Sequence, residues 1–285
     1  MKKLLVKIIV LVCVLAMALP AATAFAATDI KGNDKVDVDL SYTSDGYFRV
    51  TYKGGGSAKL KVIVDTPNKI QYQYNLGTSK DGEVFPLTEG DGTYTIGVYT
   101  NTSGNKYAKT FSTPATVKLT NAFAPFLAPS QFVNYNSKSE TVAKAASLTK
   151  DKKTDLEKIN AIYDFVITFT YDAEKAATVQ SGYLPVVDSV LSAKKGICFD
   201  YAAVMTAMLR SQGIPTKLMV GYAGTTYHAW ISVYTKETGW IENFIQFDGK
   251  NWSRMDPTFD SSSKGSDSAK QFIGDGKNYT VKFQY

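Results

Sequence analysis

The apolar residues of this chain change their spacing once, between residues 120 and 150, and the change divides the sequence into two parts. In the first part, short β-branched or aromatic runs are separated by turn signals such as Asp81-Gly82 and Asp91-Gly92. Runs of this length and spacing predict antiparallel strands in a small sandwich-like all-β domain. The expected strands cover residues 36–40, 47–52, 60–64, 93–99, 107–111 and 116–119.

After residue 150 the spacing becomes helical. Thr154-Asp155-Leu156-Glu157 has the sequence of a capping box, and apolar residues then recur at helical spacing to about residue 167. A shorter helix is expected at 186–193, and a longer one begins at Cys198 and ends at Gly213. Strands at 217–222 and 227–234 follow, with a hairpin that joins 244–247 to 251–256. Helices followed by antiparallel strands predict an α+β domain.

Residues 1–26 have the features of a secretory signal peptide. Lysines 2, 3 and 7 precede an apolar run at 8–19, and Ala24-Phe25-Ala26 fits a cleavage site. The alternative is an uncleaved membrane anchor, for which the run is short. We therefore predict a secreted, extracellular protein that is associated with the cell surface and leaves the membrane after cleavage. Cleavage lowers the formal net charge from +6 to +3, and without a basic stripe we expect no nucleic-acid partner.

Cleavage would also remove Cys13 and leave Cys198 as the only cysteine. A lone cysteine in a secreted chain pairs between chains, is buried for structural reasons, or keeps a reactive thiol. The start of a helix favours the thiolate, because the free N–H groups and the helix dipole stabilise negative charge. Gly196 allows a tight turn onto this helix, and the N–H of Cys198 is free to donate to an oxyanion.

His228 is the only histidine of the chain. On its predicted strand, alternation puts Tyr227, Ala229, Ile231 and Val233 on one apolar face, which we expect to face the core. His228 would then leave from the other face, which also carries Trp230, and point toward Cys198. The alternative is a surface histidine on a half-exposed strand. Asp256 ends the last predicted strand before Pro257. We expect this strand to lie next to the strand of His228, where a carboxylate at the strand end can orient the imidazole.

Taken together, these segments resemble the transglutaminase-like superfamily, a branch of the papain-like cysteine fold. The resemblance covers roughly residues 150–260. It rests on Lys195-Gly196-Ile197-Cys198-Phe199-Asp200-Tyr201-Ala202, Leu209-Arg210-Ser211-Gln212-Gly213-Ile214-Pro215, His228-Ala229-Trp230-Ile231, Gly239-Trp240 and Met255-Asp256-Pro257-Thr258.

The resemblance implies a Cys198 nucleophile, a His228 general base and acid, and an orienting Asp256. Thr170-Tyr171-Asp172 resembles a family segment upstream of the cysteine, so Tyr171 is expected to line the cleft or to donate to the oxyanion. The alternative is that Tyr171 only packs at a helix end. Trp230 is expected to wall the cleft, and Asp200 to support the structure.

The implied organisation is a signal peptide at 1–26, a β-sandwich-like domain at 27–120, a linker at 121–150 with Pro125 and Pro129, and a papain-like catalytic domain at 151–285. We predict acyl transfer through a thioester, on glutamine side chains or peptide amides of extracellular or envelope proteins. The alternatives are a cysteine protease of the same fold and a non-catalytic binding or scaffold protein of the cell surface. A redox role lacks a Cys-x-x-Cys pair.

The expected partners are a protein or peptide substrate and, through the N-terminal domain, a cell-wall or surface component. We expect no metal and no cofactor, because acidic residues with calcium-loop spacing are missing from the sequence of the catalytic region.

Overall fold

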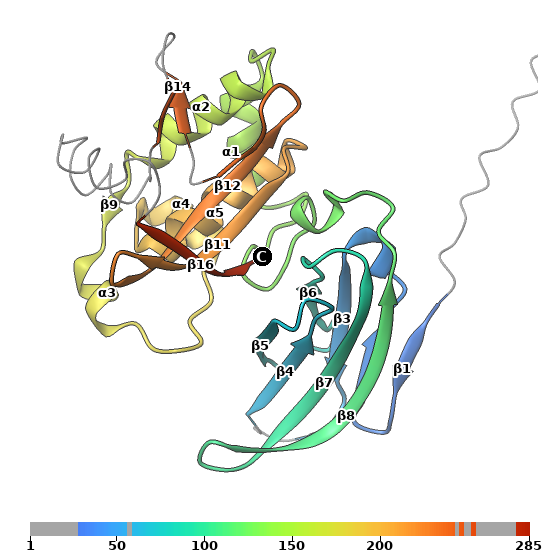
Figure 1. The fold of residues 1–285 in the computed structure, drawn as a ribbon. Helices are drawn as coiled ribbons and strands as arrows, with labels where there is room; N and C mark the ends of the chain where they lie inside the picture. The colour runs from blue at the N-terminus through green and yellow to red at the C-terminus, as the bar shows by residue number, and fades with distance from the viewer. Residues whose placement is uncertain (1–27, 56–58, 243–244, 248–251, 255–277) are drawn as a thin grey trace, which may run out of the picture.

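A computed structural model describes residues 28–55, 59–242, 245–247, 252–254 and 278–285. The chain forms a β-rich part followed by a part with both helices and strands (Figure 1). The α+β fold class, with an all-β part in front, is therefore confirmed.

The β-rich part consists of two four-stranded sheets in which all neighbouring strands run antiparallel. One sheet has the order β1-β2-β3-β6 and the other β5-β4-β7-β8. The strands are β1 (Ile30–Gly32), β2 (Val36–Asp39), β3 (Tyr47–Tyr52), β4 (Leu60–Asp65), β5 (Gln71–Leu76), β6 (Glu83–Pro86), β7 (Gly92–Ser103) and β8 (Lys106–Val117). A short 3-10 helix, η1 (Thr43–Asp45), lies between β2 and β3.

The two stretches predicted as separate strands at 107–111 and 116–119 belong to the single strand β8. Pro114 lies inside this strand, where it pairs with Thr95 of β7. β8 is an edge strand with only β7 beside it, and an edge strand is where a sheet tolerates proline.

The two sheets enclose a shared apolar core. Phe48 and Phe85 stack within one sheet with ring centroids 5.5 Å apart, and Tyr74 of the other sheet meets Phe85 edge-on at 5.0 Å. Val38 and Ile96 are fully buried beside them. Burial of each such side chain stabilises the fold by about 1.5–3 kcal/mol, which is why alternation was a reliable signal here.

The second part is built around helix α5 (Cys198–Ser211), whose residues 200–210 are all buried. Helices pack against α5 from one direction and strands β11 and β12 from another. The helices are α1 (Glu140–Thr149), α2 (Asp155–Val166), α3 (Ala173–Thr178) and α4 (Val187–Ala193), with a 3-10 helix η2 (Ala124–Phe126) before them. Helix α1 begins inside the stretch predicted as a linker, where its small and polar residues gave a weak pattern.

An antiparallel sheet of order β13-β12-β11-β16 covers the helices (Figure 1). Its strands are β11 (Thr216–Ala223), β12 (Thr226–Thr235), β13 (Gly239–Ile241) and β16 (Tyr279–Gln284). Strands β14 (Ile245–Phe247) and β15 (Trp252–Arg254) form the predicted hairpin. A two-stranded parallel pair joins β9 (Thr170–Tyr171) to β10 (Lys195–Gly196).

One predicted neighbour relation is wrong. We expected the strand before Asp256 to lie beside the strand of His228, but β14 and β15 pair only with each other in the described part of the chain. The place beside β12 is taken by β13, which follows β12 after a turn of three residues. A short connection favours pairing with the nearest segment of the chain, so β13 reaches that edge first.

The end of the chain lies between the two parts (Figure 1). The Tyr285 ring contacts Tyr72 and Tyr74 of the sandwich edge-on, with centroids 5.5 and 5.9 Å away. The side chain of Gln284 donates to Glu89 Oε1 at 3.2 Å and to the Thr88 carbonyl at 3.1 Å. Strand β16 therefore pairs in the sheet of the second part, while its last residue, Gln284, and the adjoining Tyr285 contact the sandwich.

Arg210 of α5 fixes the same junction. Its buried guanidinium donates to the carbonyls of Thr216 at 2.9 Å, Ala128 at 2.7 Å and Tyr285 at 2.7 Å. Burial lowers the pKa of Arg210 to about 10, so the side chain is still charged at neutral pH.

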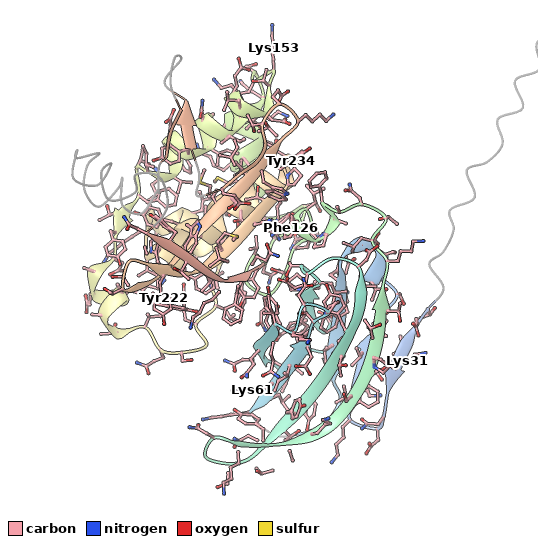
Figure 2. All side chains as sticks on the ribbon, in the orientation of Figure 1. Lys31, Lys61, Phe126, Lys153, Tyr222 and Tyr234 are labelled. Carbon is pink, nitrogen blue, oxygen red and sulfur yellow. The ribbon has the colours of Figure 1, made fainter. Side chains whose placement is uncertain are left out.

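A second aromatic cluster lies where η2 meets the sheet. Figure 2 labels two of its residues, Phe126 of η2 and Tyr234 of β12. Both contact the Trp240 ring, at 5.3 and 5.6 Å, and the ammonium of Lys217 lies 4.2 Å from the centre of that ring.

Candidate active site

Cys198 is the first residue of α5, and its free thiol is half-buried. The helix begins there because the Asp200 carboxylate accepts a hydrogen bond from the Ile197 N–H at 2.9 Å. The sulfur therefore lies where backbone N–H groups lack intrahelical acceptors and the helix dipole is positive. This local environment is the one predicted from the sequence, and it favours negative charge on sulfur.

Gly196 has a more specific role than a tight turn. A Cβ atom at this position would lie 2.6 Å from Asp200 Cβ and 2.8 Å from its Oδ2. The Asp200 side chain thus occupies the space that a larger residue at 196 would need. Glycine is required because the helix cap closes over it.

Tyr171 lies beside the nucleophile segment through a direct strand pair. In the parallel pairing of β9 and β10 it is the partner of Gly196, two residues before Cys198. Partial burial, and then the neighbouring Cys198, raise the pKa of Tyr171 above its ordinary value. Its hydroxyl therefore stays protonated at neutral pH and can donate a hydrogen bond, as either a cleft or an oxyanion role would need.

Tyr227 is a second tyrosine near the nucleophile, and its placement corrects a prediction. We expected it to face the core with Ala229 and Ile231, which are buried, yet Tyr227 is 58% exposed. Its ring meets Tyr222 of β11 at a centroid distance of 5.5 Å. Partial burial, Tyr222 and Cys198 raise the pKa of Tyr227. The buried part of the apolar face of β12 therefore ends before Tyr227, and Tyr227 is exposed near Cys198.

His228 is buried, with 5% of its surface exposed, so it is not a surface histidine. Its ring stacks on Trp230 with centroids 6.1 Å apart, and Tyr279 of β16 contacts both rings, at 6.3 Å and 5.0 Å. Trp230 is 2% exposed, and its Nε1 has no hydrogen-bond partner among the residues that the structure describes. Both faces of β12 are thus buried here.

The pairing of the Cys198 sulfur with the His228 ring stays a prediction. Ala229 and Ile231 share one apolar core with α5, so alternation makes His228 leave β12 from the other face. A contact between the imidazole and the sulfur would therefore form at the N-terminal end of α5, outside the interface between α5 and the apolar face of β12. Asp256 lies outside the described residues, and its orienting role also stays a prediction.

Asp200 supports the structure, as expected, through partners that the sequence did not reveal. Its fully buried carboxylate accepts from Lys175 Nζ and from the Tyr183 hydroxyl, both at 2.6 Å. Sequence reasoning missed two residues of the site. Lys175 lies on a helix of only six residues, and Tyr279 lies on a strand that follows a long polar stretch of sequence. Neither residue had a local pattern that pointed to the site.

In the segments with described placement, no group of three or more potential metal ligands occurs. Those segments also lack any helix long and apolar enough to cross a membrane.

The chain is similar to known proteins over part of its length. Residues 142–257 match the family model of the transglutaminase-like superfamily. The uncharacterised protein YebA of Bacillus subtilis is 27% identical over 117 residues, which are 34% of this chain and 16% of YebA. A protein-glutamine gamma-glutamyltransferase of Pseudomonas aeruginosa is 30% identical over 87 residues, or 26% of this chain and 13% of that enzyme. The chain thus matches only a small share of each relative's length.

Among solved structures, a candidate cysteine protease from Cytophaga hutchinsonii aligns over 74% of this chain and 78% of its own, with 16% identity and a TM-score of 0.37.

Proposed function

Residues 142–257 of this chain are a transglutaminase-like domain, and from this premise we propose that the protein is a cysteine-dependent acyltransferase. The observation that carries the proposal is the position of Cys198. It is a free, half-buried thiol on the first residue of a buried helix, inside the matched family segment. A structural cysteine needs no such place, whereas a thiolate nucleophile does.

In the proposed reaction the Cys198 thiolate attacks the carbonyl carbon of an amide, from a glutamine side chain or a peptide bond. The C–N bond breaks, His228 gives its proton to the departing nitrogen, and a thioester remains on sulfur. An amine or water then attacks the thioester while His228 takes a proton from it. The new acyl bond forms, and the thiolate is released.

Several groups could stabilise the oxyanion of each tetrahedral intermediate. The backbone N–H of Cys198 belongs to the first turn of α5, where N–H groups have no intrahelical acceptor. The protonated hydroxyl of Tyr171 lies on the strand paired with Gly196. Trp230 is more suited to shaping the site, because its ring is packed between His228 and Tyr279.

The accepting group decides the outcome. An amine gives a cross-link or a modified protein, and water gives deamidation or peptide cleavage. The name of the Pseudomonas aeruginosa relative favours glutamine as the acyl donor. Peptide cleavage by the same residues is the alternative.

We further propose that residues 1–26 direct export and that the sandwich holds the enzyme to a cell-wall or surface component, so that envelope proteins are its substrates. The sequence pattern of residues 1–26 supports the first step. The hydrogen bonds of Gln284 to Thr88 and Glu89 are compatible with the second, because they would keep the transfer domain beside a surface-bound sandwich.

Mass spectrometry of a glutamine-containing peptide, offered with and without a primary amine, tests the reaction. Incorporation of the amine shows transfer, conversion of glutamine to glutamate shows deamidation, and fragments show cleavage. Cys198→Ala is the matched control and is expected to abolish each product. If a library of such peptides remains unchanged by the wild-type protein, the enzyme proposal is wrong and a binding role is left.

A further inference from the structure

Asp200 creates an electrostatic problem beside the nucleophile. Its carboxylate is fully buried and lies two residues after Cys198, at the same end of α5. Its Oδ2 accepts from the N–H of Ile197, the residue directly before Cys198, and negative charge at this helix start opposes the formation of a thiolate, because like charges disfavour each other. The carboxylate nevertheless holds the helix start through the Ile197 N–H, so it cannot simply be absent.

Lys175 supplies the opposite charge. Its Nζ lies 2.6 Å from Asp200 Oδ2 and 2.7 Å from the Tyr183 hydroxyl, and that hydroxyl donates to Asp200 Oδ1 at 2.6 Å. Burial alone would lower the pKa of Lys175, but the hydrogen bonds to Asp200 and Tyr183 outweigh it, and the pKa is raised. The lysine is therefore charged wherever the protein is folded near neutral pH.

The position of Lys175 is itself fixed to the nucleophile segment. Asp172 caps α3 by accepting from the Lys175 N–H at 3.1 Å, and the N–H of Asp172 donates to the Gly196 carbonyl at 2.8 Å. An ion pair between Asp172 and Lys195, at 3.2 Å, ties the same two segments. The ammonium is thus held on Asp200 from a neighbouring element that is locked to the strand before Cys198.

We propose that Lys175 is a positioning residue that neutralises the Asp200 carboxylate, so that Asp200 can fix the first turn of α5 without suppressing the Cys198 thiolate. The inference rests on the proposed nucleophilic role of Cys198. It assigns to this ion pair, in which Asp200 is buried and Lys175 is partly exposed, a role in reactivity beyond its role in folding.

Other titratable and charged groups lie on the elements around this turn, and they are unchanged in every comparison below. They are Tyr171 on β9, Asp172 and Lys195 at the β9–β10 pair, Tyr183, and Tyr227 and His228 on β12.

The pH dependence of Cys198 alkylation by iodoacetamide tests the proposal, because only the thiolate reacts quickly. In Lys175→Met the midpoint of the rate profile should rise by roughly one pH unit or more, the size expected for a newly uncompensated charge at short range. Lys175→Arg keeps the charge and should restore the wild-type midpoint. Lys158→Met, which breaks the partly exposed pair with Asp155, is the matched control and should leave the midpoint unchanged.

Two further variants keep the test decisive if Lys175→Met does not fold. Asp200→Asn leaves Lys175 unopposed and should lower the midpoint, while Lys175→Met combined with Asp200→Asn should return it toward the wild type. Thermal unfolding of each variant shows whether it is folded. A folded Lys175→Met with an unmoved midpoint, or a folded Asp200→Asn whose midpoint does not fall, overturns the proposal.

This readout separates the two proposals. Shifted midpoints without acyl transfer by the wild type would uphold the charge coupling and refute the enzyme. Acyl transfer by the wild type together with unshifted midpoints would uphold the enzyme proposal and refute the charge coupling.

Discussion

Replacement of Gly196 by alanine tests whether the helix cap and the reactivity of Cys198 depend on one close approach. The added Cβ would lie 2.6 Å from Asp200 Cβ and 2.8 Å from Oδ2, whereas carbon atoms pack at about 3.5–4.0 Å. One of the two side chains must therefore move by about 1 Å. Overpacking of this kind costs about 1–3 kcal/mol.

The displacement should reach the nucleophile as well. Asp200 Oδ2 accepts from both Ile197 N–H and Lys175, so moving it loosens the first turn of α5. For a chain of this size we expect Gly196→Ala to lower the melting temperature by roughly 2–10 °C. Alkylation of Cys198 should slow at neutral pH, because the thiolate loses part of its preorganised environment.

Differential scanning fluorimetry and alkylation kinetics measure both effects. The matched control is Gly55→Ala, since a Cβ at Gly55 would meet no atom within 4 Å. It should leave the melting temperature and the alkylation rate unchanged. A Gly196→Ala protein that melts and reacts like the wild type would refute the close approach and the link between cap and nucleophile.

Three other changes have defined outcomes. Arg210→Met should lower the free energy of unfolding by about 2–4 kcal/mol in urea denaturation, because three carbonyls lose a charged donor; an unchanged midpoint would contradict the junction described above. Tyr227→Ala should change the free energy of unfolding by no more than about 0.5 kcal/mol, since the ring is largely exposed. The same variant should lower kcat/KM for a peptide substrate several-fold. Equal kcat/KM in the variant and the wild type would place the substrate elsewhere. Backbone N–H groups of Lys153 and Thr154 lower the pKa of Glu157, so its capping contribution to stability should be present above the unfolded pKa and lost as the pH falls through the folded pKa. In thermal melts, Glu157→Gln should therefore weaken the loss of stability at acid pH. Identical pH profiles of the variant and the wild type would contradict this.

Much of the fold could be predicted because its signals are local. The capping box at Thr154 and Glu157 is present, with α2 beginning at Asp155 as expected. Helix α5 starts at Cys198 and β12 contains His228, as their patterns indicated.

The misses share a physical cause, which is that long-range partners have no local signal. Strand β16 pairs with β11 from the end of the chain, and β13 displaces the hairpin from its expected place beside β12. Tyr227 has the period of a core residue but is 58% exposed, because alternation along a strand does not show where the core ends. Lys175 reaches Asp200 across 25 positions of sequence, so only the structure connects them.

Trapping of the covalent intermediate tests the central claim most directly. The protein is mixed with a glutamine peptide, quenched in acid, and analysed by mass spectrometry of the intact chain and of its digest. We predict an acyl adduct on Cys198 that is absent in Cys198→Ala and forms about 10²–10⁴-fold more slowly in His228→Ala. An adduct on another residue, or equal rates in the wild type and His228→Ala, would contradict the account.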